Sequence, residues 1–416
     1  MAQRTDVEQP NRVVHYFRDV DLTSGSRPDF IPESFALNCW AEDCWPRRFL
    51  LRVAIRFHHI WATFGVRNGH ATIQGRHPAV CFSGFSVSDL VAVRDGLAAA
   101  SGAVTQYAIT FPTHSAEQAG ATKVVRGENL RAMLQASHPS EPVTQEEIWR
   151  NQYRYLDGQL DIFGNQTAEL EWRWPYTLNY RRAIEKIERE GHLGDKLPGI
   201  DLAQKKWSQI GVVVATEADA LRLQYDILCL IDQQVVSVDH FDHLLVCERL
   251  PKELDGLTAT EQEASMTAAC LDFKSGVTVS DEDAAVAAAD FKARISALET
   301  SSLKGEIQER GGCWVYFEDN SHPYVRALLK AGLVVVNKSG RYLGTLTELG
   351  RGRDLEERQL IVKTLCKQLE QEHGVPCSYF SVRDSWLSGD LPSYCGHPGR
   401  GFYRITDEPD EEDTDV

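Results

Sequence analysis

The apolar residues of this chain fall into short runs that alternate with longer stretches of helical spacing. The short runs are rich in β-branched and aromatic residues, which favour strands. In the first 250 residues the predicted strands are 12–18 (RVVHYFR), 79–82, 106–111, 168–174 (AELEWRW), 210–215 and 243–247.

The longer stretches carry an apolar residue at every third or fourth position, which predicts amphipathic helices. They are 33–65, a helix that starts near Ser86 or Ser88, 146–156 and 217–232. We expect the helix that starts near Ser86 to end close to Gly102, because glycine tolerates the positive φ of a helix C-terminus. Strands and helices in this order predict an α+β fold with a mixed sheet.

The composition changes after residue 255. Residues 259–303 are rich in Ala, Glu, Asp, Ser and Thr and predict a helical linker. Strands are predicted again at 313–317 and 333–336, with a helix over 355–372 that Gly374 ends. The predicted organisation is an α+β domain (1–255), a helical linker (256–305), a small α/β domain (306–406) and a disordered acidic tail (407–416).

Charge and composition narrow the function classes. A net charge of −16 repels a phosphate backbone, so general nucleic-acid binding is not expected, although a local basic groove stays open. No run approaches the roughly 20 apolar residues that span a bilayer, so membrane insertion is not expected. The ten cysteines are scattered singly and no secretory signal precedes them, so we expect reduced thiols and a cytoplasmic protein.

The most informative candidate site is the strand that contains Glu169 and Glu171. The two carboxylates and Arg173 share one face, while Leu170, Trp172 and Trp174 share the other. Two carboxylates about 7 Å apart suit chemistry on a sugar, where one stabilises an oxocarbenium ion and the other orients the nucleophile. The alternative is a solvated polar face held by ion pairs over an apolar core.

Other candidates each have a structural alternative. His15 is either a core histidine or a hydrogen-bond donor to a ribose hydroxyl. Ser83 ends a strand before Gly84, where it either supports a ligand or forms a turn. Arg76 and His77 either hold a phosphate or lie in a solvated loop.

The order of these blocks resembles a known family. His15-Tyr16 in a first strand, a CFS strand end, a YAITF strand and then ELEWRW are similar to the AbiGi-type abortive-infection family, over about residues 12–250. The resemblance extends to the ADP-ribosyltransferase-like fold of DarT-type toxins. It implies that Glu171 is the catalytic carboxylate and Glu169 the accessory acid. It also implies that His15, Tyr16, Arg76 and Ser83 contact NAD.

The resemblance implies an ADP-ribosyltransferase-like enzyme of phage defence that uses NAD as a substrate, requires no metal and modifies an unknown acceptor macromolecule. The alternative is a non-catalytic antitoxin-like or sensor protein that binds a toxin or antitoxin partner. In the C-terminal part, Cys377, Cys395, His373 and His397 form either a metal or thiol site or ordinary structure, and single Cys and His residues are weak signals.

Overall fold

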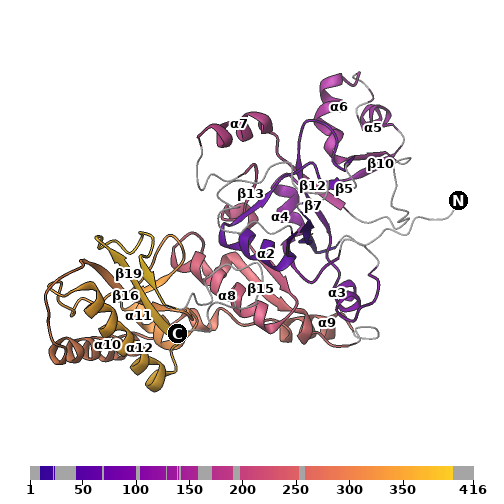
Figure 1. The fold of residues 1–416 in the computed structure, drawn as a ribbon. Coiled ribbons are helices and arrows are strands. Elements are labelled where there is room, and N and C mark those ends of the chain that lie inside the picture. Colours follow the sequence, from indigo (N-terminus) through magenta and orange to yellow (C-terminus); the bar gives the residue numbers. More distant parts are fainter. Residues whose placement is uncertain are drawn as a thin grey trace. The chain divides into compact units, whose positions relative to one another are not determined.

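A computed structural model gives the fold of the chain. It describes residues 10–21, 23, 44–67, 70–99, 104–127, 129–137, 139, 142–157, 171–190, 197–252 and 258–396. The chain divides into two compact units, the first made of residues 1–220, 239–271 and 403–416 and the second of 221–238 and 272–402. Both units mix helices with strands (Figure 1), which confirms the predicted α+β class.

The first unit is built on a seven-stranded mixed sheet with the order β15-β14-β8-β1-β7-β12-β9. Its strands are β1 (Arg12–Tyr16), β7 (Ala79–Gly84), β8 (Ala108–Pro112), β9 (Thr122–Lys123), β12 (Glu171–Pro175), β14 (Ile210–Val214) and β15 (Phe241–Val246). β14 and β15 pair in parallel, and the other neighbours pair antiparallel. The central strand β1 therefore lies between β8 and β7, and its backbone is hydrogen-bonded on both sides.

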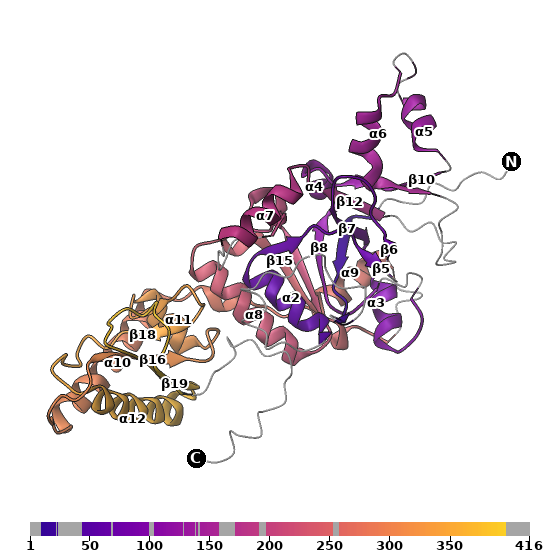
Figure 2. The same ribbon diagram turned by 45° about the horizontal axis from the view of Figure 1, so that its top comes forward.

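Smaller sheets and helices surround this sheet. They are β2 (Val20–Asp21), β3 (Cys44–Trp45), α2 (Arg47–Arg56), β4 (His59–Trp61), β5 (Val66–Arg67), β6 (His70–Ala71), α3 (Val87–Arg94), α4 (Thr113–Gln118), β10 (Val125–Gly127), α5 (Leu130–Ser137), α6 (Gln145–Asn151), η1 (Gln152–Arg154), β11 (Tyr155–Asp157), α7 (Tyr180–Glu190), β13 (Gly199–Asp201), η2 (Lys205–Trp207), η3 (Val238–His240), η4 (Cys247–Arg249) and α9 (Ala259–Ala268). In both views α5 and α6 lie side by side (Figures 1 and 2). A capping box of Thr144 and Glu147 starts α6.

The two faces of the large sheet pack differently. One face carries aromatic rings, among which Phe82 contacts Phe111 and Trp207 at centroid distances of 5.7 and 6.2 Å. On the same face Trp172 Nε1 donates to Glu117 Oε1 at the end of α4, at 3.1 Å. The other face buries aliphatic residues of β1, β8, β14 and β15 beneath α3, with Val14 of β1 and Leu90 of α3 in the same cluster.

The second unit contains a five-stranded sheet with the order β17-β18-β16-β19-β20. Its elements are η5 (Ser275–Val277), α10 (Asp281–Ser301), β16 (Gly311–Phe317), α11 (Pro323–Lys330), β17 (Val334–Val336), β18 (Tyr342–Gly344), α12 (Leu355–His373), β19 (Cys377–Arg383) and β20 (Tyr394–Cys395). α12 packs on β16 and β19, and α10 packs on α11 and α12. From Leu221 onward, α8 (Glu217–Asp232) also belongs to this unit, and its Tyr225 joins the core.

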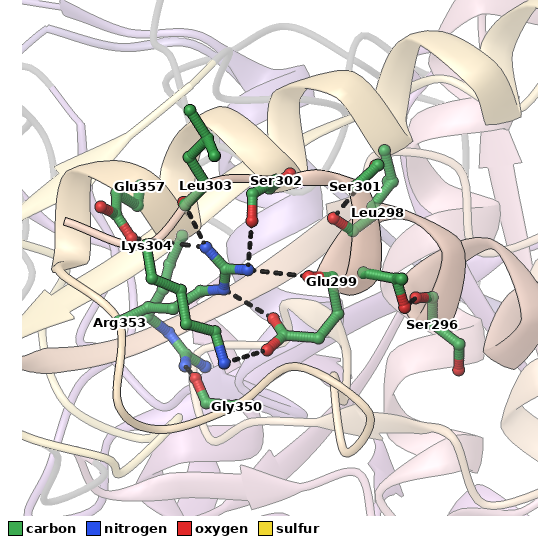
Figure 3. A network of polar contacts seen from close by, with 12 residues as sticks. Ser296, Leu298, Glu299, Ser301, Ser302, Leu303, Lys304, Gly350, Arg353 and Glu357 are labelled. Carbon is green, nitrogen blue, oxygen red and sulfur yellow. Dashed lines mark hydrogen bonds and ion pairs between the residues drawn. The ribbon is translucent and has the colours of Figure 1, made fainter.

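Two adjacent residues of the second unit tie its long helices together. The Arg353 side chain donates to the carbonyls of Glu299, Ser302 and Leu303 at the end of α10, and to the Glu299 carboxylate at 2.6 Å (Figure 3). Asp354 caps α12 and accepts from the backbone N–H groups of residues 308 and 309, at 2.7 Å each. These contacts satisfy the backbone groups that helix ends leave unpaired.

Several element predictions need correction. The helix after β7 starts with Ser86 as its cap and ends at Arg94, not near Gly102, because Gly96 with φ 75° closes it. In the described part of 33–65 the helix covers only Arg47–Arg56. Periodicity also missed α4, α7 and α11, since short helices give few repeats of the pattern.

The region expected to be a linker contains α9 and α10. α9 is part of the first unit and α10 of the second, where its Phe291 and Ile295 are buried in the core. The acidic tail lies outside the described residues. Within the described residues every cysteine is free, and no helix is long and apolar enough to cross a membrane.

Candidate functional site

The candidate site is the part of the large sheet where β1, β7 and β12 run side by side. Glu171 is directly opposite Ser83, and Ser83 is directly opposite Val14 on the other side. Opposed residues of paired strands point to the same face, with Cβ atoms about 5 Å apart. Because side chains alternate along a strand, Tyr16 shares this face with Ser83 and Glu171. Three of the predicted site residues therefore share one face of the sheet, where Ser83 and Glu171 are cross-strand neighbours and Tyr16 lies two residues along β1 from the residue opposite Ser83.

Glu171 is held by an ion pair on this face. Arg173 Nε donates to Glu171 Oε1 at 2.8 Å, and the Arg173 side chain is 3% exposed whereas that of Glu171 is 22% exposed. Arg173 Nη1 also donates to the backbone carbonyl of Tyr153 at 2.6 Å. Burial acts to lower the pKa of Arg173, but Cys81 and Glu171 outweigh it and the net shift is upward. Glu171 is thus the counter-ion of a buried guanidinium.

His15 lies on the opposite face of the sheet from Glu171. It follows Val14, which is on the Ser83 face, and its ring contacts Phe17 and Phe82 at centroid distances of 5.0 and 6.2 Å. His15 Nδ1 donates to the Cys81 carbonyl at 2.9 Å in the tautomer that carries its proton there. Burial lowers the pKa of His15, which keeps the ring neutral at pH 7. His15 is therefore a hydrogen-bonded histidine of the aromatic core.

The remaining predicted residues do not join the site. The Arg76 guanidinium lies 4.1 Å from the centroid of the Trp149 ring, in an exposed loop before β7. Its neighbour His77 contacts the Tyr176 carbonyl through Nδ1 at 3.1 Å. Glu169 lies outside the described residues, so the pairing of the two carboxylates is not seen. Of the two predicted carboxylates, only Glu171 belongs to the described residues.

The face with Tyr16, Ser83 and Glu171 offers few groups that can bind a ligand or transfer a proton. Among the described residues Glu171 Oε2 has no hydrogen bond, so this oxygen can accept a bond from a hydroxyl or amide of a ligand. Among the described residues the printed side-chain partner of Glu171 is Arg173, a cation that cannot act as a base. The arrangement suits hydrogen bonding to a ligand better than proton transfer.

Within the described residues, the cysteine and histidine residues of the C-terminal part are not arranged to hold a metal ion. Cys377 Sγ contacts the Cys366 carbonyl at 3.8 Å, and the neighbouring Cys366 thiol together with burial raises the pKa of the Cys377 thiol. His373 instead pairs with Asp290 at 3.0 Å. His397 lies outside the described residues, and within the described ones no group of three or more His, Cys, Asp or Glu is arranged to hold a metal ion.

A second arrangement was not predicted from the sequence. Two arginines of the second unit, Arg351 and Arg358, both lie against the ring of Trp386, at 5.1 and 4.8 Å from its centroid. The segment Gly350 to Arg353 reads GRGR, and this local concentration of arginine in an acidic chain was the available signal. Trp386 lies far from this segment in the sequence, so the sequence alone could not predict its contact with these arginines.

The fold and both sites define a two-unit α+β protein with one large mixed sheet and a separate helix-covered sheet. A family model described as a protein of unknown function (DUF4427) matches residues 280–404, which lie mostly in the second unit. No curated protein and no solved structure matches the chain.

Proposed function

We propose that the first unit is a non-catalytic binding module, of the antitoxin-like or sensor kind, and that Glu171 serves its structure and its ligand contacts. The observation that carries this proposal is the placement of His15 and Glu171 on opposite faces of one sheet. Cleavage of a glycosidic bond requires that the group orienting the ribose and the carboxylate contact the same substrate. Side chains separated by a sheet cannot do so.

The ion pair of Glu171 supports the same proposal. A carboxylate that balances a guanidinium with 3% exposure is needed to keep that charge in the interior. The resemblance to the abortive-infection family supports a role in defence, with a toxin or antitoxin as the partner protein. A separate binding function of the C-terminal unit is compatible with this proposal.

A second candidate is the NAD-dependent ADP-ribosyltransferase-like activity, acting without His15. It is favoured by the shared face of Tyr16, Ser83 and Glu171, on which the neighbouring Ser83 and Glu171 supply a hydroxyl and a carboxylate. In this candidate Glu171 would have to leave Arg173 to stabilise an oxocarbenium ion.

Nicotinamide release distinguishes the two candidates. Purified full-length protein is incubated with NAD and cell lysate as a source of acceptors, in parallel with Glu171→Gln and with Glu185→Gln, whose carboxylate is exposed on α7. We expect no release from any of the three proteins. We also expect Glu171→Gln to lower the free energy of unfolding by about 1–3 kcal/mol, because it removes the counter-ion of Arg173.

Release by the wild type that is lost in Glu171→Gln and kept in Glu185→Gln would contradict the binding proposal. It would establish the second candidate. Equal stability of the wild type and Glu171→Gln would show that Arg173 does not need this counter-ion.

A further inference from the structure

Arg358 of α12 is a buried cation without a carboxylate partner. It is 3% exposed, and its Nη1 donates to the Gly350 carbonyl at 2.8 Å. Its Nε is buried and has no hydrogen-bond partner, and among the described residues no carboxylate forms an ion pair with it. Burying an unpaired charge costs several kcal/mol, so such a residue is unexpected unless something else neutralises it.

The other deeply buried arginines of this unit are neutralised. Arg353 pairs with Glu299 at 2.6 Å and with Glu357 at 3.4 Å, and all its nitrogens donate (Figure 3). Arg326 binds Asp232 through both terminal nitrogens, and both side chains are 5% exposed. Among the described residues Arg358 differs from these two arginines in having no ion pair, although the Nε of Arg326, like that of Arg358, is buried and has no hydrogen-bond partner.

Arg351 and Trp386 complete a cluster around Arg358. Arg351 is exposed, and among the described residues it forms no ion pair. Its guanidinium and that of Arg358 both lie within about 5 Å of the Trp386 ring, whose residue is 39% exposed. Burial lowers the pKa of Arg358, and the charges of Arg351 and Arg353 act in the same direction, although Cys313 and Glu299 oppose them. The cluster is locally positive in an acidic chain.

We propose that Arg351, Arg358 and Trp386 form a binding site for a small phosphate ester that carries a planar ring, such as a nucleoside monophosphate. Guanidinium groups bind phosphate oxygens through paired hydrogen bonds, and the exposed Arg351, which forms no ion pair among the described residues, offers such a group beside Arg358. The exposed part of the Trp386 indole provides a surface on which a base stacks. This site lies in the second unit and is independent of the function proposed for the first.

The test is isothermal titration calorimetry of the full-length protein at low ionic strength with two probes, inorganic phosphate and adenosine monophosphate. Both are expected to bind with a 1:1 stoichiometry, adenosine monophosphate about tenfold more tightly because of stacking. Added salt weakens both, since the contacts are ionic. Trp386→Leu is expected to remove the difference between the two probes.

Three arginine variants locate the site. Arg351→Ala and Arg358→Met are each expected to weaken phosphate binding at least about tenfold. The matched control is Arg383→Ala, which removes an equal charge from an exposed residue of β19 whose partners are Glu309 and Asp384. It is expected to leave both affinities unchanged. Arg358→Met should fold, because a long apolar side chain replaces a charge that is buried and unpaired.

The proposal is overturned if neither probe binds at millimolar concentration, or if Arg383→Ala weakens binding as much as Arg351→Ala does. Binding of an acidic peptide or of single-stranded DNA without binding of either probe would also overturn it, because the site would then recognise a different class of ligand. Unfolding of Arg358→Met with unchanged affinity in Arg351→Ala would assign these arginines to the structure alone.

Discussion

Replacing Arg353 with methionine tests how the second unit holds its helices together. The guanidinium is completely buried and donates to three carbonyls at the end of α10 and to the carboxylates of Glu299 and Glu357. Methionine fills a similar volume but offers no donor. The variant therefore leaves carbonyl groups without partners and removes the arginine partner of both carboxylates, of which Glu299 keeps an ion pair with Lys304 at 2.9 Å.

The expected cost is large for a single substitution. Removing one partner of a buried ion pair costs about 3–5 kcal/mol, because the remaining charge stays unpaired. Glu299 and Glu357 are 18% and 24% exposed and Glu299 still pairs with Lys304, so water and this lysine relieve part of the cost. The helix carbonyls add a further loss, since each unsatisfied buried group costs about 1–3 kcal/mol and only some will find water. We expect a decrease of about 3–5 kcal/mol in the free energy of unfolding of the second unit.

Hydrogen exchange followed by mass spectrometry measures this in the full-length protein, because it reports peptides of α10 and α12 separately from the first unit. The matched control is Arg351→Met, two residues away, which is exposed and whose guanidinium lies 5.1 Å from the centroid of the Trp386 ring. It is expected to change stability by less than about 0.5 kcal/mol. Similar protection of α10 in the two variants would refute the assignment of Arg353 as the residue that ties α10 to α12.

Two further predictions concern the large sheet. In Gly211→Ala the new Cβ would lie 2.2 Å from His243 Nε2 and 2.4 Å from Thr110 Oγ1, so we expect a loss of about 1–3 kcal/mol in urea denaturation, whereas Gly352→Ala, with open space around it, should be neutral. Burial lowers the pKa of His15, so the unfolded state takes up a proton first, and stability should fall as the pH drops below about 6.5. Urea midpoints of His15→Gln should decline less between about pH 7 and pH 5, and an identical slope would contradict this.

Local signals in the sequence were enough to predict many of the helices and strands. Helix α8 was predicted at 217–232 and has these bounds, because strong helical spacing follows a β-branched strand. Gly374, with φ 69°, ends α12 as predicted, since the left-handed conformation at a helix end favours glycine. The strands at 79–82 and 313–317 were also found, each slightly longer than expected.

The partners of each side chain were decided only by the tertiary structure. The alternation along β12 placed Glu171 and Arg173 on one face, as the sequence indicated, but their ion pair depends on what covers that face. His15 and Glu171 are on opposite faces because of the register of β1, β7 and β12, which come from distant parts of the chain. A shift of one residue in either pairing would have reversed this result.

The arginines of the second unit show the same difference between what the sequence indicates and what the tertiary structure decides. The sequence places Arg351, Arg353 and Arg358 within eight residues, with nothing to separate their roles. Packing of α10 against α12 gives Arg353 its carboxylates, while Arg358 is buried against Trp386 without one. The sequence therefore determined where these charges occur along the chain. Only the fold decided which of them is neutralised, because burial and counter-ions come from segments brought together in space.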